Sequence, residues 1–322
     1  MSSNNTVTIY GAGGAGIDIL TKLMRTDLSE LANVKEAYVD GSRSNVSERS
    51  VQDPDKWYFL EGVDGAGKIR KTNYDVTNRS ISDILFKLKP SDLNILIFSA
   101  SGGSGSVIGP KLIEALYAQN KAVLVFLVGS TESGNTTENT MKTISSLRNI
   151  AIKNNQFCNV CYESNENNLR NAEVDAIMIA TIRAVLDLYS GKHHGLDSAD
   201  VLTWAKPVLG AGVSPELGLL DVFQDRDDAV SVNAPISVAE LYGDNKPVAG
   251  TIPADYNTFG TRKRTGEDSL YFVIHTDGLN EILMELRQTF DDYEQRRAAR
   301  DKKSKAAQNF IRGDVQGDGM EL

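Results

Sequence analysis

The sequence predicts an α/β fold with a mostly parallel, Rossmann-like sheet, and three observations support this prediction. Short apolar runs alternate with helical patterns through the first half of the chain. Glycine-rich turns directly follow two of these runs. Hydrophobic residues make up 41% and charged residues 24% of the chain, as in ordinary globular proteins. Strands separated by helices, with glycine at the turns, are typical of a parallel sheet covered by helices on both faces.

The first half contains the elements of this sheet. Strands are expected at the short apolar runs, which are residues 7–10, 37–39, 95–98, 123–128 and 157–162. Helices are expected between them, at about residues 18–24, up to about residue 119, and at 141–153. The segment 41–80 is polar and poorly periodic, so we expect loops there with one short helix.

The second half begins with a central helix. Residues 174–189 are apolar around most of a helical wheel, which predicts a helix buried on several sides, as between two domains. A strand is expected at 270–275 and a long charged helix from 279 to about 311. The expected division is a nucleotide-binding domain, a central helix, a smaller α/β domain, a long helix and an acidic tail, at residues 1–172, 173–195, 196–278, 279–312 and 313–322.

Size and charge limit the functions that the chain can have. A chain of 322 residues exceeds what one core usually supports, so two linked domains are expected. The net charge of −9 argues against direct binding to nucleic acid or to an anionic membrane. The longest apolar run, residues 122–128, is too short to span a membrane, and the first residues do not resemble a signal peptide. We therefore expect a cytoplasmic protein.

Cys158 and Cys161 form the only CxxC motif. Residues three apart on a strand point to opposite faces, so these two sulfurs would not meet. The sequence contains only three histidines, and no second cysteine pair. We expect buried free thiols and assign no protein metal ligands.

The first glycine-rich turn, residues 11–16, satisfies G-x-G-x-x-G between a strand and a helix. Glycine there lets the backbone approach a phosphate closely and present its N–H groups at a helix N-terminus. Asp40 ends the second strand and could bind a ribose, as in dinucleotide enzymes. This turn alone leaves NAD, a mononucleotide and a purely structural turn open.

The second turn favours a mononucleotide. It comprises six small residues between a strand and a helix: Ser101, Gly102, Gly103, Ser104, Gly105 and Ser106. Its amides form a second anion-binding concavity, and its three hydroxyls can donate to phosphate oxygens. A dinucleotide needs one such loop for its pyrophosphate, whereas two loops on adjacent strands suit the phosphate chain of a nucleoside triphosphate.

A third glycine-rich segment, residues 62–68, fails as a Walker A loop. Ile69 stands where Ser or Thr would hold Mg²⁺, and the flanks lack a clear strand and helix. Asp64, Gly65, Ala66 and Gly67 are either a loop that closes over a terminal phosphate or a plain surface turn.

At these motifs the chain resembles the tubulin/FtsZ superfamily of filament-forming GTPases. The family signature G-G-G-T-G-[ST]-G corresponds to residues 101–107, with Ser104 replacing the threonine and Val107 the last glycine. Both departures resemble the bacteriophage tubulin (PhuZ-type) branch, as do residues 105–110, 141–143 and 318–320. The resemblance covers nearly the whole chain and is thin over residues 41–75 and 205–265.

The resemblance implies a GTP or GDP site with Mg²⁺. The first loop matches the family's G-G-x-G-x-N as Gly13, Gly14, Ala15, Gly16, Ile17 and Asp18, with Asp18 in place of an asparagine near the guanine. Glu132 falls where the family places a ribose-binding acid, and Asp175 where it reads the guanine edge. From the residues alone, helix capping and pairing with the helix dipole are the favoured roles of Asp175.

Asp197 and Asp200 form the expected catalytic pair. Their spacing at a helix start places both carboxylates on one face, where they can orient or polarise a water. The same spacing makes a good capping pair. The resemblance implies that this segment inserts into the next subunit's nucleotide pocket. Hydrolysis would then require head-to-tail assembly, and such contacts give filaments.

The resemblance also implies partners. The acidic tail 313–322 would dock on a basic surface of the neighbouring subunit, and the filaments would position phage DNA or a capsid-related cargo in the infected cell. The basic stretch 296–305 is read as a solvated helix face, because the chain is acidic and aromatic residues are not interleaved. Two other functions stay open: an NAD(P)-dependent oxidoreductase and a non-hydrolysing nucleotide-binding subunit.

Overall fold

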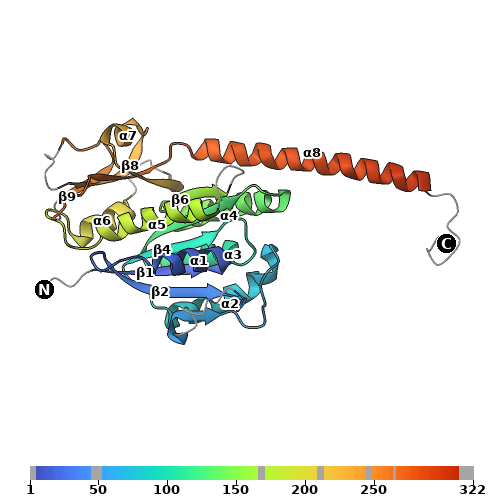
Figure 1. Cartoon of the computed structure of the whole chain (residues 1–322), viewed down its shortest axis with the longest axis horizontal. Helices are drawn as coiled ribbons and strands as arrows, with labels where there is room; N and C mark the ends of the chain where they lie inside the picture. Colours follow the sequence, from blue (N-terminus) through green and yellow to red (C-terminus); the bar gives the residue numbers. More distant parts are fainter. Residues whose placement is uncertain are drawn as a thin grey trace.

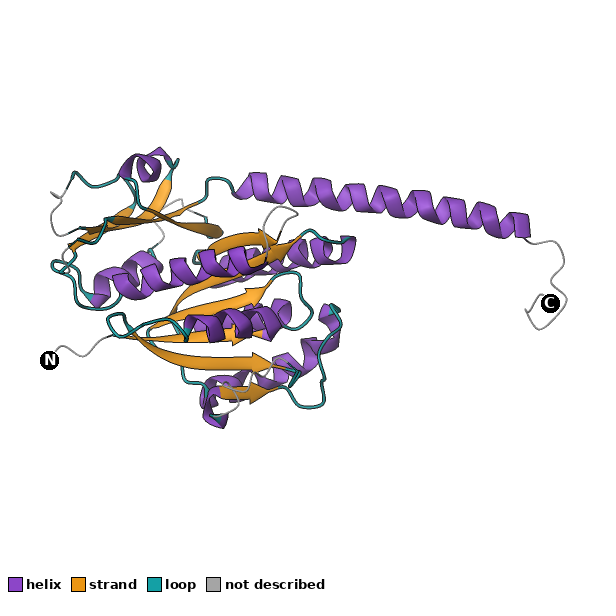
Figure 2. Ribbon diagram, in the orientation of Figure 1, coloured by secondary structure: helices purple, strands orange, loops and turns teal. Residues whose placement is uncertain are grey.

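The computed structural model describes residues 5–44, 53–165, 171–208, 214–243, 249–263 and 266–311. Over these residues the chain forms a ten-stranded sheet in the order β3-β2-β1-β4-β5-β6-β7-β10-β8-β9, with helices packed on it (Figure 1). The ribbon in Figure 2 shows one long helix leaving the body and ending far from it. The predicted α/β class with a mostly parallel sheet is confirmed.

The first six strands are parallel to one another. They are β1 (Thr6–Ala12), β2 (Asn33–Asp40), β3 (Trp57–Phe59), β4 (Leu93–Ser99), β5 (Ala122–Ser130) and β6 (Cys158–Asn165). All five strands expected in this half are present, and β3 is an additional one. Strand β1 lies at the centre of this part, between β2 and β4.

Helices cover both faces of this part, as expected. Residues alternate along β1, so that Val7 and Ile9 pack into one core cluster and Tyr10 and Ala12 into the other. The first cluster includes α1 (Gly13–Leu23) and α5 (Asn171–Leu188); the second includes α2 (Arg70–Lys87), α3 (Gly105–Ala118) and α4 (Gly134–Asn154). Cys158 and Cys161 fall in opposite clusters and are free and buried, as predicted.

The remaining strands continue the same sheet. Strand β7 (Leu217–Phe223) pairs parallel with β6, and β10 (Leu270–His275) pairs antiparallel with both β7 and β8 (Pro235–Tyr242). Strand β9 (Tyr256–Thr261) completes the edge beside β8. Helices α6 (Ser198–Ala205) and α7 (Arg226–Ser231) accompany these strands. The sheet is therefore continuous across the expected change of domain.

Two helices differ from the sequence prediction. Helix α1 begins at Gly13, not near residue 18, so the glycine-rich turn is itself the first helical turn. The segment expected to hold loops and one short helix ends in an 18-residue helix, α2. Helix α2 buries only Asn73, Thr77, Ile84 and Leu85, which is why its apolar periodicity is weak in the sequence.

The central helix α5 is less buried than expected. Its first half buries Val174 and Met178 and exposes Ala176, Ile177 and Ala180 to solvent. From Val185 onward the helix is buried. An apolar helical wheel does not reveal whether a second surface covers the helix, and over this first half none of the described residues does.

The long helix α8 (Leu279–Ile311) has the predicted bounds almost to the residue. It packs on the body near its start, where Leu279 and Leu286 are buried and the Tyr293 hydroxyl donates to the Thr131 carbonyl at 2.9 Å. Its later turns project away from the sheet (Figure 1). The acidic tail 313–322 lies outside the described residues. Within the part of the chain that the structure describes, no helix is long and apolar enough to cross a membrane.

Candidate functional site

A cavity of about 560 Å³ lies at the carboxyl ends of β1, β2 and β4. Three glycine-rich segments that are far apart in the sequence meet around it. The residues that line the cavity are Ala12, Gly13, Gly14, Ala15, Asp40, Ser42, Ser44, Asp64, Gly65, Ala66, Gly67, Lys68, Ser99, Ser101, Gly102, Gly103, Ser104 and Gly105. Most of the expected phosphate-loop residues are in this set.

The first two segments touch through their backbones. Gly13 has a φ of +67°, and a Cβ added to it would lie 2.7 Å from the amide nitrogen of Gly105. Only glycine allows both this conformation and this approach. Gly16 has another role: a Cβ there would lie 2.0 Å from the Ile97 carbonyl oxygen. Gly16 therefore packs α1 against β4 beneath the cavity and does not line it.

Two helices begin at this cavity without side-chain caps among the described residues. The capping position of α1 is Ala12, and that of α3 is Ser104, whose hydroxyl does not cap the helix. The first N–H groups of a helix lack intrahelical partners and carry partial positive charge. Two uncapped helix starts facing one cavity suit an anion with several phosphates.

The serine hydroxyls of the second loop have different partners. Ser106 is buried and donates to the Gly102 carbonyl at 2.5 Å, so it shapes the loop and does not face the cavity. The Ser101 hydroxyl contacts that of Ser99 at 3.0 Å. The Ser104 hydroxyl accepts from the Asn73 side-chain amide at 2.9 Å. Ser101 and Ser104 line the cavity, whereas the prediction that all three hydroxyls face a phosphate is wrong for Ser106.

The third segment packs directly on the second. A Cβ added to Gly103 would lie 2.5 Å from the Ala66 Cβ and 3.1 Å from the Lys68 nitrogen. The Asn139 side-chain amide donates to the carbonyls of Lys68, at 2.9 Å, and Ser101, at 3.1 Å. The alternative of a plain surface turn at Gly65, Ala66 and Gly67 is therefore wrong.

Sequence reasoning missed several residues of this site. Ser42 and Ser44 line the cavity, and the Ser42 hydroxyl donates at 2.9 Å to the carboxylate of Asp64, the first residue of the predicted third loop. Asn139 is buried inside α4 and joins two loops. A polar residue in a polar segment carries no distinctive pattern, so only their position in the fold identifies them.

The two acids expected to contact the guanine base, Asp18 and Asp175, lie close to each other and are not among the residues that line the cavity. The Lys22 ammonium donates to Asp18 at 2.6 Å and to Asp175 at 2.5 Å, joining α1 to α5. Partial burial lowers the pKa of Lys22, but its bonds to Asp175 and Asp18 outweigh this and raise it above the ordinary value. Asp175 is the fifth residue of α5, and its carboxylate contacts Lys22, which does not support a capping role.

Glu132 does not line the cavity in this structure. It is exposed, and its N–H donates to the Ser130 hydroxyl at 3.4 Å. The next residue, Ser133, caps α4 by accepting from the Thr136 amide. Glu132 thus lies on the loop between β5 and α4, at the carboxyl edge of the sheet.

Asp197 and Asp200 form a complete capping box at the start of α6. The Asp200 amide donates to the Asp197 carboxylate at 3.0 Å, and the Asp197 amide donates to the Asp200 carboxylate at 3.3 Å. The Tyr256 hydroxyl also donates to the Asp200 carbonyl at 3.3 Å. The capping interpretation describes what these acids do within one chain.

The acid pair and the cavity lie at opposite ends of the sheet. Helix α5 ends where β1 and β2 begin, because the Ala32 amide donates to the Leu186 carbonyl and the Asn5 side chain donates to the Tyr189 carbonyl. Asn159, near the start of β6, likewise donates to the carbonyl of Ala205 at the end of α6. Strand β1 spans seven residues, or about 23 Å. One chain cannot bring these acids to its own cavity.

No family model matches the chain, but the chain itself is similar to curated phage proteins. It is 31% identical over 289 residues to the phage tubulin-like protein of Pseudomonas phage 201phi2-1, covering 86% of this chain and 87% of the relative. It is 29% identical over 278 residues to that of Pseudomonas phage PhiPA3, covering 84% and 85%.

Solved structures agree with the sequence comparison. The phage tubulin PhuZ, in a GDP form, matches with a TM-score of 0.83 and 27% identity over 91% of this chain and 92% of that one. A protofilament of TubZ from bacteriophage PhiKZ has the same fold, with a TM-score of 0.83 and 23% identity over 98% and 95%. Because sequence similarity and fold both extend over most of the chain, the protein belongs to the phage tubulin branch of the tubulin/FtsZ superfamily.

Proposed function

We propose that the protein is a GTPase that polymerises head to tail and hydrolyses GTP between subunits. One observation carries this proposal: the cavity suited to phosphates and the acid pair at the start of α6 occupy opposite ends of the same chain. Head-to-tail stacking brings the acids of one subunit to the cavity of the next. Such heterologous contacts repeat without closing and give a filament.

The cavity supports binding of a nucleoside triphosphate. Its uncapped helix starts and glycine backbones offer N–H groups to phosphate oxygens. Guanine is favoured because a similar phage tubulin is solved with GDP, and because the carboxylates of Asp18 and Asp175 can accept the N1–H and N2–H of this base. Glu132 is the proposed contact to the ribose.

The donors in the cavity also fit Mg²⁺, which prefers oxygen ligands and retains several waters. Asp64 and Ser101 offer a carboxylate and a hydroxyl there. No group of three His, Cys, Asp or Glu that could hold a metal ion occurs among the described residues. Phosphate oxygens and water would therefore complete the coordination, and the ion would neutralise phosphate charge.

The proposed catalytic step needs little covalent chemistry from the protein. Phosphoryl transfer depends on positioning and on charge stabilisation, so Asp197 and Asp200 need only orient the attacking water. Each carboxylate accepts one backbone N–H within its own chain, that of Asp200 also accepts from the Tyr256 hydroxyl at 3.5 Å, and both keep lone pairs for that water. The site is complete only in the polymer, so hydrolysis follows assembly.

Filament structures of related proteins support self-association. One neighbour is a PhuZ201 filament and another is the PhiKZ TubZ protofilament. In this chain α8 projects past the sheet edge where the strands end (Figure 1). Its 33 residues span about 50 Å, enough to carry the acidic tail 313–322 to the next subunit. The filaments would position phage DNA or a capsid-related cargo in the host cytoplasm.

Phosphate release from GTP and Mg²⁺, measured over a range of protein concentrations, tests this function. The rate per subunit should be near zero below a threshold and rise above it. Asp197→Asn and Asp200→Asn should abolish turnover while keeping the helix, because asparagine caps as well as aspartate at position 197 and its side-chain oxygen still accepts the Asp197 amide at position 200. Asp225→Asn, at the cap of α7, is the matched control and should turn over normally.

The other outcomes point to other functions. A rate per subunit that does not depend on concentration would mean a self-contained site. Tight GTP binding without turnover would indicate a non-hydrolysing subunit, in which Asp197 and Asp200 act only as caps. Stabilisation by NAD(H) and not by GTP would indicate a dinucleotide enzyme using Asp40. Deleting residues 313–322 should raise the threshold concentration for assembly, and an unchanged threshold would exclude the docking role of the tail.

A further inference from the structure

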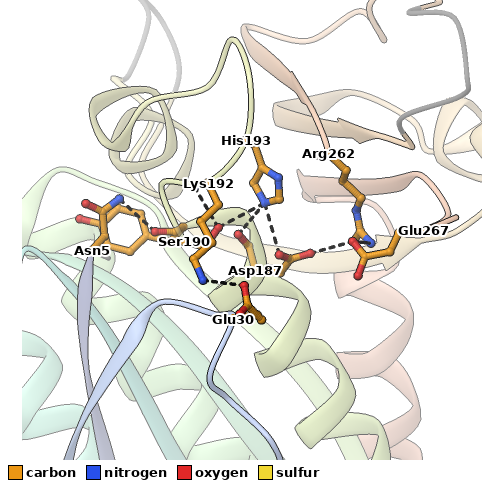
Figure 3. Close-up of polar contacts among 9 residues, drawn as sticks. Asn5, Glu30, Asp187, Ser190, Lys192, His193, Arg262 and Glu267 are labelled. Carbon is orange, nitrogen blue, oxygen red and sulfur yellow. Dashed lines mark hydrogen bonds and ion pairs between the residues drawn. The ribbon is translucent and has the colours of Figure 1, made fainter. Parts of the chain in front are cut away.

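A buried polar cluster lies between the end of α5 and the edge strand β9 (Figure 3). The Asp187 carboxylate, in the last turn of α5, pairs with the Arg262 guanidinium at 2.9 Å, and their side chains are only 11% and 8% exposed. Arg262 also donates to Glu267 at 2.9 Å. The His193 ring, 6% exposed, is held against Asp187 on the opposite side from Arg262 (Figure 3).

The contacts of His193 determine which nitrogen carries its proton. Its Nε2 lies 2.9 Å from the Asp187 carbonyl oxygen and 3.3 Å from the Asp187 carboxylate. The carbonyl and carboxylate oxygens only accept, so Nε2 donates to them, and the Ser190 hydroxyl also lies 3.3 Å from Nε2. Nδ1 is buried and has no hydrogen-bond partner among the described residues. The ring is thus fixed through one donor to a residue of the central helix.

Stability alone does not explain this cluster. A buried ion pair loses hydration energy that its attraction barely recovers, and apolar residues of similar size often stabilise a fold as well or better. A buried Nδ1 without a partner adds a further cost. What such a cluster provides is a defined geometry, because each member is held by charge and by directed hydrogen bonds.

The segment so fixed leads directly to the acid pair. The backbones of His194 and Thr261 exchange two hydrogen bonds of 2.9 Å, one residue from His193 and one from Arg262. Gly195 follows with a φ of +76° and turns the chain. Asp197, the cap of α6, is four residues beyond His193. Both ends of the cluster, at His193 and Arg262, therefore border the segment that carries Asp197.

The acids have few anchors of their own. Asp197 is exposed, and its hydrogen bonds stay within the capping box. For Asp200, the Tyr256 hydroxyl adds contacts to the carbonyl at 3.3 Å and to the carboxylate at 3.5 Å. A capping box fixes the acids relative to α6 and leaves the direction of the preceding segment to other contacts. The Asp187 cluster supplies those contacts.

We propose that Asp187, His193 and Arg262 form a latch that holds residues 191–197 in place and thereby positions Asp197 and Asp200 for the neighbouring subunit's nucleotide. This inference rests on the proposed hydrolysis between subunits. The three residues are positioning residues, since their side chains lie beneath the surface and none of them lines the cavity. Loss of the latch slows hydrolysis in the polymer and leaves nucleotide binding by the monomer intact.

Two substitutions of His193 separate its polar role from its packing. His193→Leu fills the same space without a donor, whereas the side-chain N–H of Gln in His193→Gln reaches the position of Nε2. His194→Leu is the matched control, because His194 is exposed and contributes only its backbone to the strand contact. All variants are made in the full-length chain.

The first measurement is amide hydrogen exchange of residues 191–200 in the GDP-bound monomer, which does not depend on hydrolysis. We expect at least tenfold faster exchange at the His194 amide in His193→Leu, and exchange near that of the wild type in His193→Gln and His194→Leu. Unchanged exchange in His193→Leu would overturn the latch.

The second measurement is phosphate release per polymerised subunit, with polymer mass determined by sedimentation. We expect about a tenfold loss in His193→Leu, recovery in His193→Gln and no change in GTP affinity of the monomer. Faster exchange with unchanged turnover per polymerised subunit would refute the positioning role. Wild-type turnover that is independent of concentration would refute the proposed function itself, while the exchange experiment would still decide whether the latch exists.

Discussion

Alanine at Gly103 should weaken nucleotide binding, and alanine at the adjacent Gly102 should not. A Cβ at Gly103 would lie 2.5 Å from the Ala66 Cβ and 3.0 Å from the Ile69 nitrogen. A Cβ at Gly102 would meet its nearest atom, the Ser99 Cβ, at an ordinary 3.7 Å. Both substitutions add one carbon atom to the same loop, but only Gly103→Ala pushes residues 62–68 away from that loop.

The size of the effect follows from that displacement. Restoring ordinary contact requires a shift of about 1 Å, since packed carbon atoms sit about 3.5–4.0 Å apart. The bond from Asn139 to the Lys68 carbonyl, now 2.9 Å long, would then exceed hydrogen-bonding length. Losing it costs about 1 kcal/mol, and the cavity loses a wall. We expect roughly tenfold weaker GTP binding, equivalent to about 1.4 kcal/mol.

Titration of the monomer with a fluorescent GTP analogue, below the assembly threshold, measures this effect. Urea unfolding of both variants controls for stability, because Gly103→Ala should lose more free energy of GTP binding than free energy of unfolding. Equal affinities for Gly102→Ala and Gly103→Ala would refute the role of the third segment as a wall of the nucleotide site.

Three further predictions concern stability. Burial raises the pKa of the Cys158 thiol to about 12, so the folded state retains a proton that the unfolded chain loses above about pH 9. The free energy of unfolding should therefore fall from about pH 9 towards about pH 12. Urea unfolding at each pH should show a shallower fall in Cys158→Ala. Trp204→Phe should cost about 2–3 kcal/mol, because the fully buried indole donates to the Phe272 carbonyl at 3.2 Å; a thermal unfolding midpoint equal to the wild type would contradict this. Ser133→Ala should cost about 1 kcal/mol by removing the cap that accepts from the Thr136 amide, and Ser231→Ala, outside any cap, should be close to neutral in the same unfolding assay.

The elements that sequence reasoning placed best are those with strong local patterns. The strand at 270–275 and the helix from 279 have the predicted bounds, because an isolated apolar run and a long charged periodic stretch each permit one structure. The two glycine turns at residues 11–16 and 101–106 were predicted for the same reason: glycine after an apolar strand has few other uses. Their meeting at one cavity follows from parallel strands, whose carboxyl ends share an edge.

The tertiary structure alone decided the contacts between segments without such patterns. From the sequence, residues 62–68 could be a surface turn or part of a phosphate site. Their packing on Gly103 places them at the cavity. The acids Asp18 and Asp175, 157 residues apart, meet through Lys22. Asp187 and Arg262 pair across 75 residues of chain.

The division has a physical reason. Local patterns reflect the backbone's own periodicity and the burial of apolar side chains, which a short window of sequence contains. A polar contact depends on where two distant backbones bring their side chains, and many polar residues could occupy either position. The sequence by itself therefore determined most of the parallel strands, the two glycine-rich turns that follow them and the family resemblance. The family resemblance already implied that the acids at the start of α6 serve another subunit, and the folded chain adds the geometry: they lie at the far end from the cavity, which supports the proposed hydrolysis between subunits.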